Sequence, residues 1–234
     1  MREVSIIGVD LAKHVFQLHG VNTAEKPVLR KKLRRTDMMM YFQKMPPTRV
    51  ALEACGASHH LARLLTSYGH DVKLIAPQLV KPYVKRGKND AADAEAICEA
   101  MSRPTMRFVP IKTPEQQAAL MLVGVRERLI RMRTQVANSI RGYAAEFGVV
   151  AAQGICRIEK LLDRVSVDHS VPELARALFA TQGKIYRQLA EEIAETEAQL
   201  SQRHRADERA RRLAEIPGVG LIGASLLTMK TPAP

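Results

Sequence analysis

Cysteine is scarce in this sequence, and its pattern excludes two classes of small, cross-linked protein. Three cysteines occur in 234 residues, at Cys55, Cys98 and Cys156, and none belongs to a CxxC pair. An odd, widely spaced set of this kind predicts neither a disulfide framework nor a zinc site. We therefore expect reduced thiols, as in a protein of the cytosol.

The sequence also lacks long apolar segments. No apolar run approaches the length needed to cross a bilayer, and the first residues do not show the charged and then apolar pattern of a signal peptide. These absences predict a soluble, cytoplasmic protein with no membrane partner.

Acidic residues are in the minority. Lys and Arg number 36 against 24 Asp and Glu, which gives a net charge of +12, while 46% of the residues are hydrophobic. The composition is globular, and the length suits one large or two small domains. A cationic surplus of this size favours a nucleic-acid partner and, in the cell, association with the nucleoid. The alternative is a chain that is merely soluble and cationic.

The acids that are present include a closely spaced pair. In the stretch GKNDAADAEAI at 87–97, Asp90 and Asp93 stand three residues apart where a helix is expected to begin, with Asn89 as its N-cap. Two carboxylates on one helix face repel each other unless a proton or a hard cation such as Mg²⁺ lies between them. Acids are also ordinary in a first helical turn, where they interact favourably with the helix dipole.

Two further acids end predicted strands. Residues 4–10 form a β-rich run that ends on Asp10, residues 15–19 form its return strand, and residues 49–53 form a strand that ends on Glu53. A strand, an acid and a short antiparallel return open an RNase H-like sheet. They also open actin-like kinases, but no glycine-rich phosphate loop accompanies Asp10. Charged residues are rarely buried unless they are paired or bind metal.

We expect these acids to converge. The alternation of strand and helix between residues 51 and 75 predicts parallel crossover units in a covered sheet. The sheet and its packing helix would then hold Asp10, Glu53, Asp90 and Asp93 together, where two divalent ions could act on a phosphodiester. The basic residues just upstream would suit the phosphate backbone, although a basic loop is more often only solvated: Lys85, Arg86 and Lys88.

The second half of the chain is expected to be helical. Thr113 and Pro114 predict a helix start, and an apolar seam follows at Leu122, Val125, Leu129, Met132, Val136, Ile140, Tyr143 and Phe147. Arginines accompany the seam and could either bind phosphates or flank a coiled coil: Arg126, Arg128, Arg131, Arg133 and Arg141. A second helix over 172–204 places Tyr186, Leu189, Ile193, Thr196 and Leu200 in a heptad-like register. This pair predicts a coiled coil and a homo-oligomer, with an ordinary helical bundle as the alternative.

A glycine-containing turn follows these helices. The word IPGVG at 216–220 lies between two helical patterns and is typical of a helix-hairpin-helix turn. Gly218 and Gly220 would let the backbone approach DNA closely and direct amide groups at a phosphate without reading bases. A plain turn is the alternative interpretation.

Four segments together resemble a known family. They are GVDLAKHVFQLHGV at 8–21, ALEACGASHHLARLL at 51–65, LIAPQLVKPYVKRGKNDAADAEAICEA at 74–100 and IPGVG at 216–220. The sequence is similar over nearly its whole length to transposases of insertion-sequence family 110, the DEDD recombinases related to the pilin-gene invertase.

The resemblance implies a domain organisation, a cofactor and partners. It implies a RuvC-like, RNase H-type catalytic domain at 1–112 with Mg²⁺, or Mn²⁺, at Asp10, Glu53, Asp90 and Asp93. A long-helix, coiled-coil region at 113–205 and the incomplete start of a helix-hairpin-helix transposase domain at 206–234 would follow. The implied partners are the DNA ends of the element, the target DNA and a structured non-coding bridge RNA. The coiled coil expected from the helices would add further copies of the chain, in a dimer or tetramer.

The end of the chain departs from the family pattern. Family members continue into a domain with a serine nucleophile, whereas this sequence stops at Pro234, and Ser225 matches no nucleophile motif. We expect metal-dependent DNA cleavage and strand transfer, with activity of this shortened chain open. The alternatives are a non-catalytic DNA- or RNA-binding transposase fragment and a RuvC-like Holliday-junction resolvase.

Overall fold

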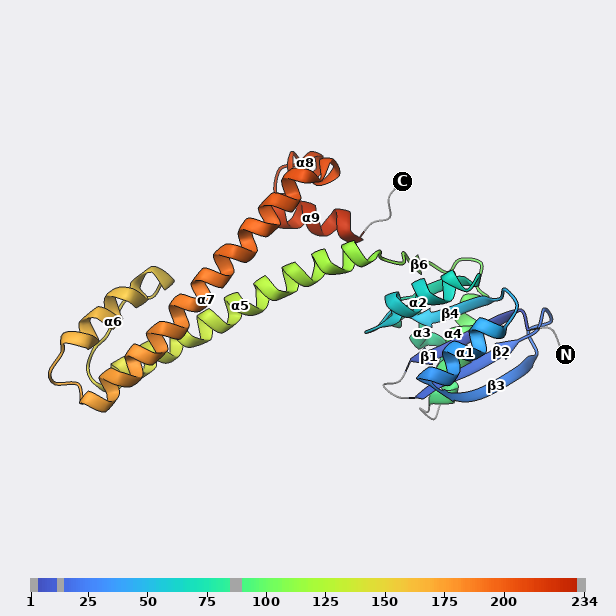
Figure 1. The fold of residues 1–234 in the computed structure, drawn as a ribbon, viewed down its shortest axis with the longest axis horizontal. Coiled ribbons are helices and arrows are strands. Elements are labelled where there is room, and N and C mark those ends of the chain that lie inside the picture. The colour runs from blue at the N-terminus through green and yellow to red at the C-terminus, as the bar shows by residue number, and fades with distance from the viewer. Residues whose placement is uncertain (1–3, 12–14, 85–89, 231–234) are drawn as a thin grey trace. The chain divides into compact units, whose positions relative to one another are not determined.

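The computed structural model describes residues 4–11, 15–84 and 90–230, with only the backbone described at residue 90 (Figure 1). The chain divides into two compact units. One comprises residues 1–116 with 230–234 and is called the sheet unit below. The other comprises residues 117–229 and is called the helical unit.

The sheet unit is built on a mixed sheet of six strands in the order β3-β2-β1-β4-β5-β6. The first three strands are antiparallel, β4 is parallel to β1, β5 is parallel to β4, and β6 returns antiparallel to β5. The strand bounds are β1 Ile6–Leu11, β2 Val15–Val21, β3 Pro27–Arg34, β4 Arg49–Glu53, β5 Asp71–Ile75 and β6 Phe108–Val109. This mixed sheet with its helices fits the expected RNase H-like α/β fold, and the expected parallel crossovers are confirmed.

Helices cover both faces of this sheet. On one face, α1 (Arg35–Lys44) and α2 (Ser58–Ser67) enclose a core that includes Phe16, Phe42 and Leu65. On the other face, α4 (Asp90–Met101) packs on Ile6, Ala51 and Ile75, and Figure 1 shows it behind the sheet. Two short elements precede it, α3 (Pro77–Val80) and the 3-10 helix η1 (Lys81–Tyr83). The strands β1 and β4 are buried on both faces, as parallel strands usually are.

Two histidines on the α1 and α2 side are structural. His70 is buried, its Nδ1 accepts from the Thr48 amide at 3.1 Å, and its Nε2 lies 2.9 Å from the Phe42 carbonyl. His59 Nδ1 accepts from the Lys112 amide at 3.2 Å. Burial, followed by the charges of Lys112 and Arg63, lowers the pKa of His59.

The helical unit is dominated by two long helices. They are α5 (Pro114–Glu146) and α7 (Glu173–Ala206), and between them come the 3-10 helix η2 (Ile155–Arg157) and α6 (Ile158–Val167). The predicted start of α5 is confirmed by reciprocal bonds, because Thr113 Oγ1 accepts from the Gln116 amide at 3.1 Å and Gln116 Oε1 accepts from the Thr113 amide at 2.9 Å. Such a capping box satisfies two amides at the beginning of a helix.

One predicted apolar seam is confirmed and the other is partly wrong. All five heptad-like positions of α7 are buried: Tyr186, Leu189, Ile193, Thr196 and Leu200. In the other seam, Ile140 is buried, but four positions are 38 to 56% exposed: Val125, Met132 and Tyr143 of α5, and Phe147 just after it. The other buried residues of α5 are Ala119, Val123, Ala137 and Ala144, and the last two belong to a core cluster with residues of α6 and α7.

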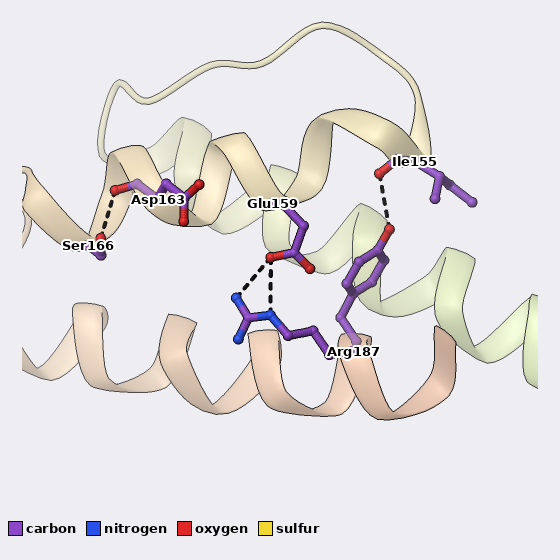
Figure 2. A network of polar contacts seen from close by, with 6 residues as sticks. Ile155, Glu159, Asp163, Ser166 and Arg187 are labelled. Atoms are coloured by element: carbon purple, nitrogen blue, oxygen red, sulfur yellow. Dashed lines mark hydrogen bonds and ion pairs between the residues drawn. The ribbon is translucent and has the colours of Figure 1, made fainter. Parts of the chain in front are cut away.

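Polar contacts join α7 to η2 and to α6 (Figure 2). Arg187 donates from Nε and Nη2 to Glu159 Oε2 at 3.1 and 2.9 Å, and Tyr186 Oη donates to the Ile155 carbonyl at 3.0 Å. Gly183 lies in the same contact, since a Cβ there would be 3.1 Å from Leu162 Cδ1. These contacts fix α6 on one side of α7.

The unit ends in two short helices, α8 (Glu208–Ala214) and α9 (Leu221–Lys230). In the turn between them, Gly218 has a φ of +86°, which favours glycine, and the Val219 amide donates to the Ile216 carbonyl at 3.0 Å. Among the described residues, no helix is both long and apolar enough to cross a membrane.

Candidate active site

Strand register places Asp10 and Glu53 next to each other. In the parallel pair β1 and β4, Val9 is opposite Leu52, so each acid is the next residue at the carboxyl end of its strand. Asp10 shares a face of the sheet with Gly8, and Glu53 shares a face with Ala51, because side chains two apart in a strand point the same way. Gly8 and Ala51 both contact α4. Both carboxylates therefore project from the α4 face.

Gly8 has no side chain, and this allows the backbone of α4 to pack directly on β1. A Cβ added at Gly8 would lie 2.3 Å from the Ala94 carbonyl oxygen and 2.5 Å from the Cys98 amide nitrogen, both backbone atoms. Real Cβ atoms do not approach backbone so closely, so only glycine permits this contact. Asp93 immediately precedes Ala94 and is thereby held at the end of the sheet that carries the two strand acids.

The pKa values of two side chains respond to these acids. Burial raises the pKa of Glu53, and the negative charge of Asp93 raises it further. Burial also raises the pKa of the Cys55 thiol, and the charges of Glu53 and Asp10 add to this effect. Three of the predicted site residues thus influence a common region: Asp10, Glu53 and Asp93. A cation placed there would relieve their mutual repulsion.

The remaining predicted members of this site are only partly described. Asp90 is the first residue of α4, three before Asp93, but its side chain is outside the described part of the structure. Lys85, Arg86, Lys88 and Asn89 also lie outside the described residues. Among the side chains that are described, no group of three or more His, Cys, Asp or Glu residues is arranged to hold a metal ion.

The strands bring further residues to the site that the sequence interpretation missed. Asp10 is opposite Gln17 in β2, and Gln17 is opposite Lys32 in β3, so these side chains form one row with Glu53 on the α4 face. Cys55 follows Glu53 closely enough to respond to both strand acids. The alternation of side chains in β2 and β3 shows which of them share a face, but the pairing that aligns them is not local.

The arginines predicted to bind nucleic acid have different surroundings. Arg126 is 21% exposed and donates from Nε to Glu197 Oε1 of α7 at 2.8 Å. Arg131 is 82% exposed and pairs with Glu127 of its own helix at 3.5 Å. Arg133 is half-buried, and its Nε has no partner among the described residues. The first of these joins α5 to α7, as expected for a residue that flanks a helix pair.

The predicted turn glycines are accessible. A Cβ added at Gly218 or Gly220 would meet no other atom within 4 Å. The backbone of this turn is therefore open on that side. The Ala224 amide donates to the Gly220 carbonyl at 2.9 Å, so Gly220 leads directly into α9.

Known proteins resemble this chain in sequence. A family model described as Transposase, for DEDD transposases of the IS110 type, matches residues 7–147. A putative transposase of Sinorhizobium fredii is 68% identical over 234 residues, which cover all of this chain and 60% of that protein. The transposase for insertion sequence element IS1328 of Yersinia enterocolitica is 41% identical over 230 residues, which cover 98% of this chain and 69% of that protein.

One solved structure, T. thermophilus RuvC in complex with a Holliday junction substrate, aligns with 44% of this chain and 98% of that chain at 13% identity and a TM-score of 0.33. The sequence comparisons are decisive, since the family model covers the strands and helix that carry all four acids and the relatives extend over the whole chain. The sequence of this chain therefore assigns it to the DEDD transposases of the IS110 family of insertion sequences.

Proposed function

We propose that the sheet unit is the metal-dependent DNA-cleaving part of an insertion-sequence transposase, with Asp10, Glu53, Asp90 and Asp93 holding Mg²⁺ or Mn²⁺. The observation that supports this most strongly is the contact at Gly8. It carries the start of α4 to the strand ends where register has already aligned Asp10 and Glu53. Neither the register nor the helix position alone would assemble the acids.

The chemistry of the donors fits a hard divalent cation. Carboxylate oxygens are preferred ligands of Mg²⁺, and burial together with the charge of Asp93 raises the pKa of Glu53, so a cation there would be favoured. When bound, such ions would activate the attacking oxygen of a phosphodiester cleavage and stabilise the leaving oxygen. The contribution of the chain is to hold three described carboxylates at fixed positions and to exclude water from the α4 side of β1.

Metal binding and cleavage can be measured separately. Asp93→Asn should weaken Mn²⁺ binding by about tenfold or more, because losing even a residue that only hydrogen-bonds to a metal ligand has an effect of this size. Electron paramagnetic resonance of Mn²⁺ measures the binding. The same variant should lose metal-dependent cleavage of DNA carrying the ends of the element. Glu99→Gln is the matched control on the same helix, since Glu99 pairs with Arg103 at 3.3 Å away from the site. Unchanged cleavage by the Asp90→Ala variant would contradict the assignment of the four acids as the metal-binding cleavage site.

The proposed roles of the other regions follow the domain boundaries expected from sequence. The helices of 113–205 would form a coiled coil that assembles a dimer or tetramer, and Arg126, Arg131 and Arg133 would contact nucleic acid. The turn at Gly218 and Gly220 in 206–234 would act as a helix-hairpin-helix that binds the DNA backbone. The open backbone of this turn and the net charge of +12 support these roles.

A structured RNA that pairs with donor and target DNA completes the proposal. Light scattering of the purified chain, with and without the element's non-coding RNA, would give the assembly state. Cleavage that is independent of this RNA and selective for four-way junctions would instead identify a Holliday-junction resolvase.

A second candidate function, nucleic-acid binding without cleavage, is favoured by the same cationic surplus, which requires no metal. It predicts binding that weakens steeply with salt and is unchanged in Asp10→Asn. Robust metal-dependent strand cleavage by the purified chain would exclude it.

A further inference from the structure

The end of the edge strand β3 and the first residue of α1 are unusually basic. Within the six residues 30–35, five are cationic: Arg30, Lys31, Lys32, Arg34 and Arg35. An edge strand often carries such residues to prevent pairing with other chains, so charge alone assigns no function. The two faces of the strand must be separated first.

Contacts assign these cations to opposite faces of the sheet. Arg30 lies 3.9 Å from Glu95 of α4, whereas Lys31 Nζ lies 4.6 Å from the centre of the Tyr41 ring in α1. Because strand side chains alternate, Lys32 and Arg34 share the α4 face with Arg30. Arg35 stacks over Phe16, which belongs to the core on the α1 side, at 5.2 Å.

The cations on the α4 face continue the row of the active-site acids. Asp10 is opposite Gln17, and Gln17 is opposite Lys32, so acid, amide and ammonium follow one another across three neighbouring strands. Two strand spacings separate the backbone positions of Asp10 and Lys32, which is about 10 Å. Arg34, opposite Val15, is the next α4-facing position along β3.

A groove of about 410 Å³ lies over this row. Gln17, Arg30 and Lys32 form part of its floor, and Ala91, Ala92 and Glu95 of α4 form its wall. Lys31 also borders the groove, but its Nζ lies over the Tyr41 ring on the other face. The small side chains of Ala91 and Ala92 leave room for a nucleic-acid strand to lie between α4 and the edge of the sheet. Lys32 and Arg34 are exposed and make no ion pair within the described part of the protein.

We propose that the phosphate backbone of a nucleic-acid strand leaves the acidic site along this groove and the adjoining α4 face of β3, with phosphates bound by Lys32 and the amide of Gln17 in the groove and by Arg34 beside it. This inference rests on the proposed function, because it uses Asp10 as the point where the strand is cut. A row that changes from acids to cations suits a phosphodiester chain, whose reacting phosphate needs metal and whose neighbouring phosphates need positive partners.

The matched faces of β3 provide the decisive variants. Lys32→Gln with Arg34→Gln, called the groove variant, removes two charges from the α4 face, one in the groove and one beside it. Lys31→Gln with Arg35→Gln removes two charges whose groups contact the α1 side. We expect the groove variant to bind a fluorescent oligothymidylate about tenfold more weakly, with a salt slope lower by about 1.4, which is 0.7 for each phosphate of a single strand. The α1-face variant should bind as the unmodified chain does. Equal losses in both variants, or no loss in either, would overturn the proposal.

Lysine acetylation of the unmodified chain tests the same point without a substitution. Bound oligothymidylate should protect Lys32 from acetylation and leave Lys31 reactive, as read by mass spectrometry. Reactivity of Lys32 that is unchanged by the oligonucleotide would contradict the groove. Repeating both measurements with oligouridylate shows whether the strand is DNA or RNA, and preferential protection by either one supports the proposal.

The groove and the proposed function can be refuted independently of each other. If Asp93→Asn abolishes cleavage while the two β3 variants bind alike, the cleavage site stands and the groove is wrong. If the groove variant loses binding but no metal-dependent cleavage is found, the groove stands as a nucleic-acid site and the proposed catalysis is wrong.

Discussion

The sheet unit and the helical unit hold their charged groups in place by different means. In the sheet unit, hydrogen-bond register aligns Asp10 with Glu53, and the backbone contact at Gly8 fixes α4 beside them. In the helical unit, long side chains reach between helices, as in the pairs Arg126 with Glu197 and Arg187 with Glu159. These partners are between 21 and 51% exposed, so solvent screens their attraction.

This difference teaches where each unit is sensitive to substitution. Register and backbone contact leave no freedom for adjustment, so a single added methyl group in the sheet unit should disturb several residues at once. Exposed side chains can rearrange, and the helices that carry them are held by their buried faces. A site for metal chemistry needs the first kind of support, because ligand positions must be fixed before the ion binds.

A glycine-to-alanine substitution should lower the unfolding free energy in the sheet unit and raise it in the helical unit. This difference is the largest effect expected. Gly8→Ala places a Cβ against the backbone of Ala94 and Cys98 and should cost about 3 kcal/mol of unfolding free energy, as overpacking does. Gly142→Ala, in α5 with no atom near the added Cβ, should stabilise by about 1 kcal/mol. Urea unfolding measures both.

A cleavage assay shows whether the contact at Gly8 positions the acids in addition to stabilising the fold. Gly8→Ala should also lower metal-dependent cleavage at a temperature where the variant is still folded, because α4 carries Asp93. A variant with Gly8→Ala that is as stable and as active as the unmodified chain would show that the close contact does not position the site.

A partly buried hydrogen bond in the helical unit should have an intermediate effect on stability. Tyr186→Phe removes the bond from the Tyr186 hydroxyl to the Ile155 carbonyl and should cost about 1 kcal/mol. Thermal unfolding followed by circular dichroism gives the value, and Tyr143→Phe is the control because Tyr143 is 56% exposed. A loss as large as that of Gly8→Ala would contradict the view that this unit adapts.

The ion pair between α5 and α7 should contribute less. A double-mutant cycle with Arg126→Gln and Glu197→Gln should give a coupling free energy of about 0.5 kcal/mol, since both partners contact solvent. The coupling should decrease as salt is added. A value that is large and independent of salt would show that the helix pair is fixed as rigidly as the sheet.

The smallest effect is expected at Glu53 in the absence of divalent ions. Its pKa is raised by burial and by Asp93, so folding binds its proton more tightly, and its contribution to stability is lost as pH rises through the folded pKa. Glu53→Gln should therefore match the unmodified chain below about pH 4, near the ordinary pKa of glutamate, and be more stable at neutral pH. Thermal unfolding across this range in a chelating buffer measures the difference. A neutral-pH loss of stability in Glu53→Gln would mean that the carboxylate has a favourable partner.

The sequence by itself determined the features that depend on neighbouring residues. Strand ends at Asp10 and Glu53, the spacing of Asp90 and Asp93, and the capping box at Thr113 and Gln116 are local patterns, and the structure has the corresponding elements. The buried register of α7 was also predictable, because its apolar positions repeat with the helical period.

Only the tertiary structure decided which of these features meet. Gly8 could not be identified as the contact for α4 from sequence, because its partners are about 90 residues away in the chain. The row from Asp10 through Gln17 to Lys32 depends on pairing between strands, and the buried face of α5 depends on which helices pack against it. Local periodicity specifies a face of an element, whereas the element that covers this face is selected by the packing of the whole unit.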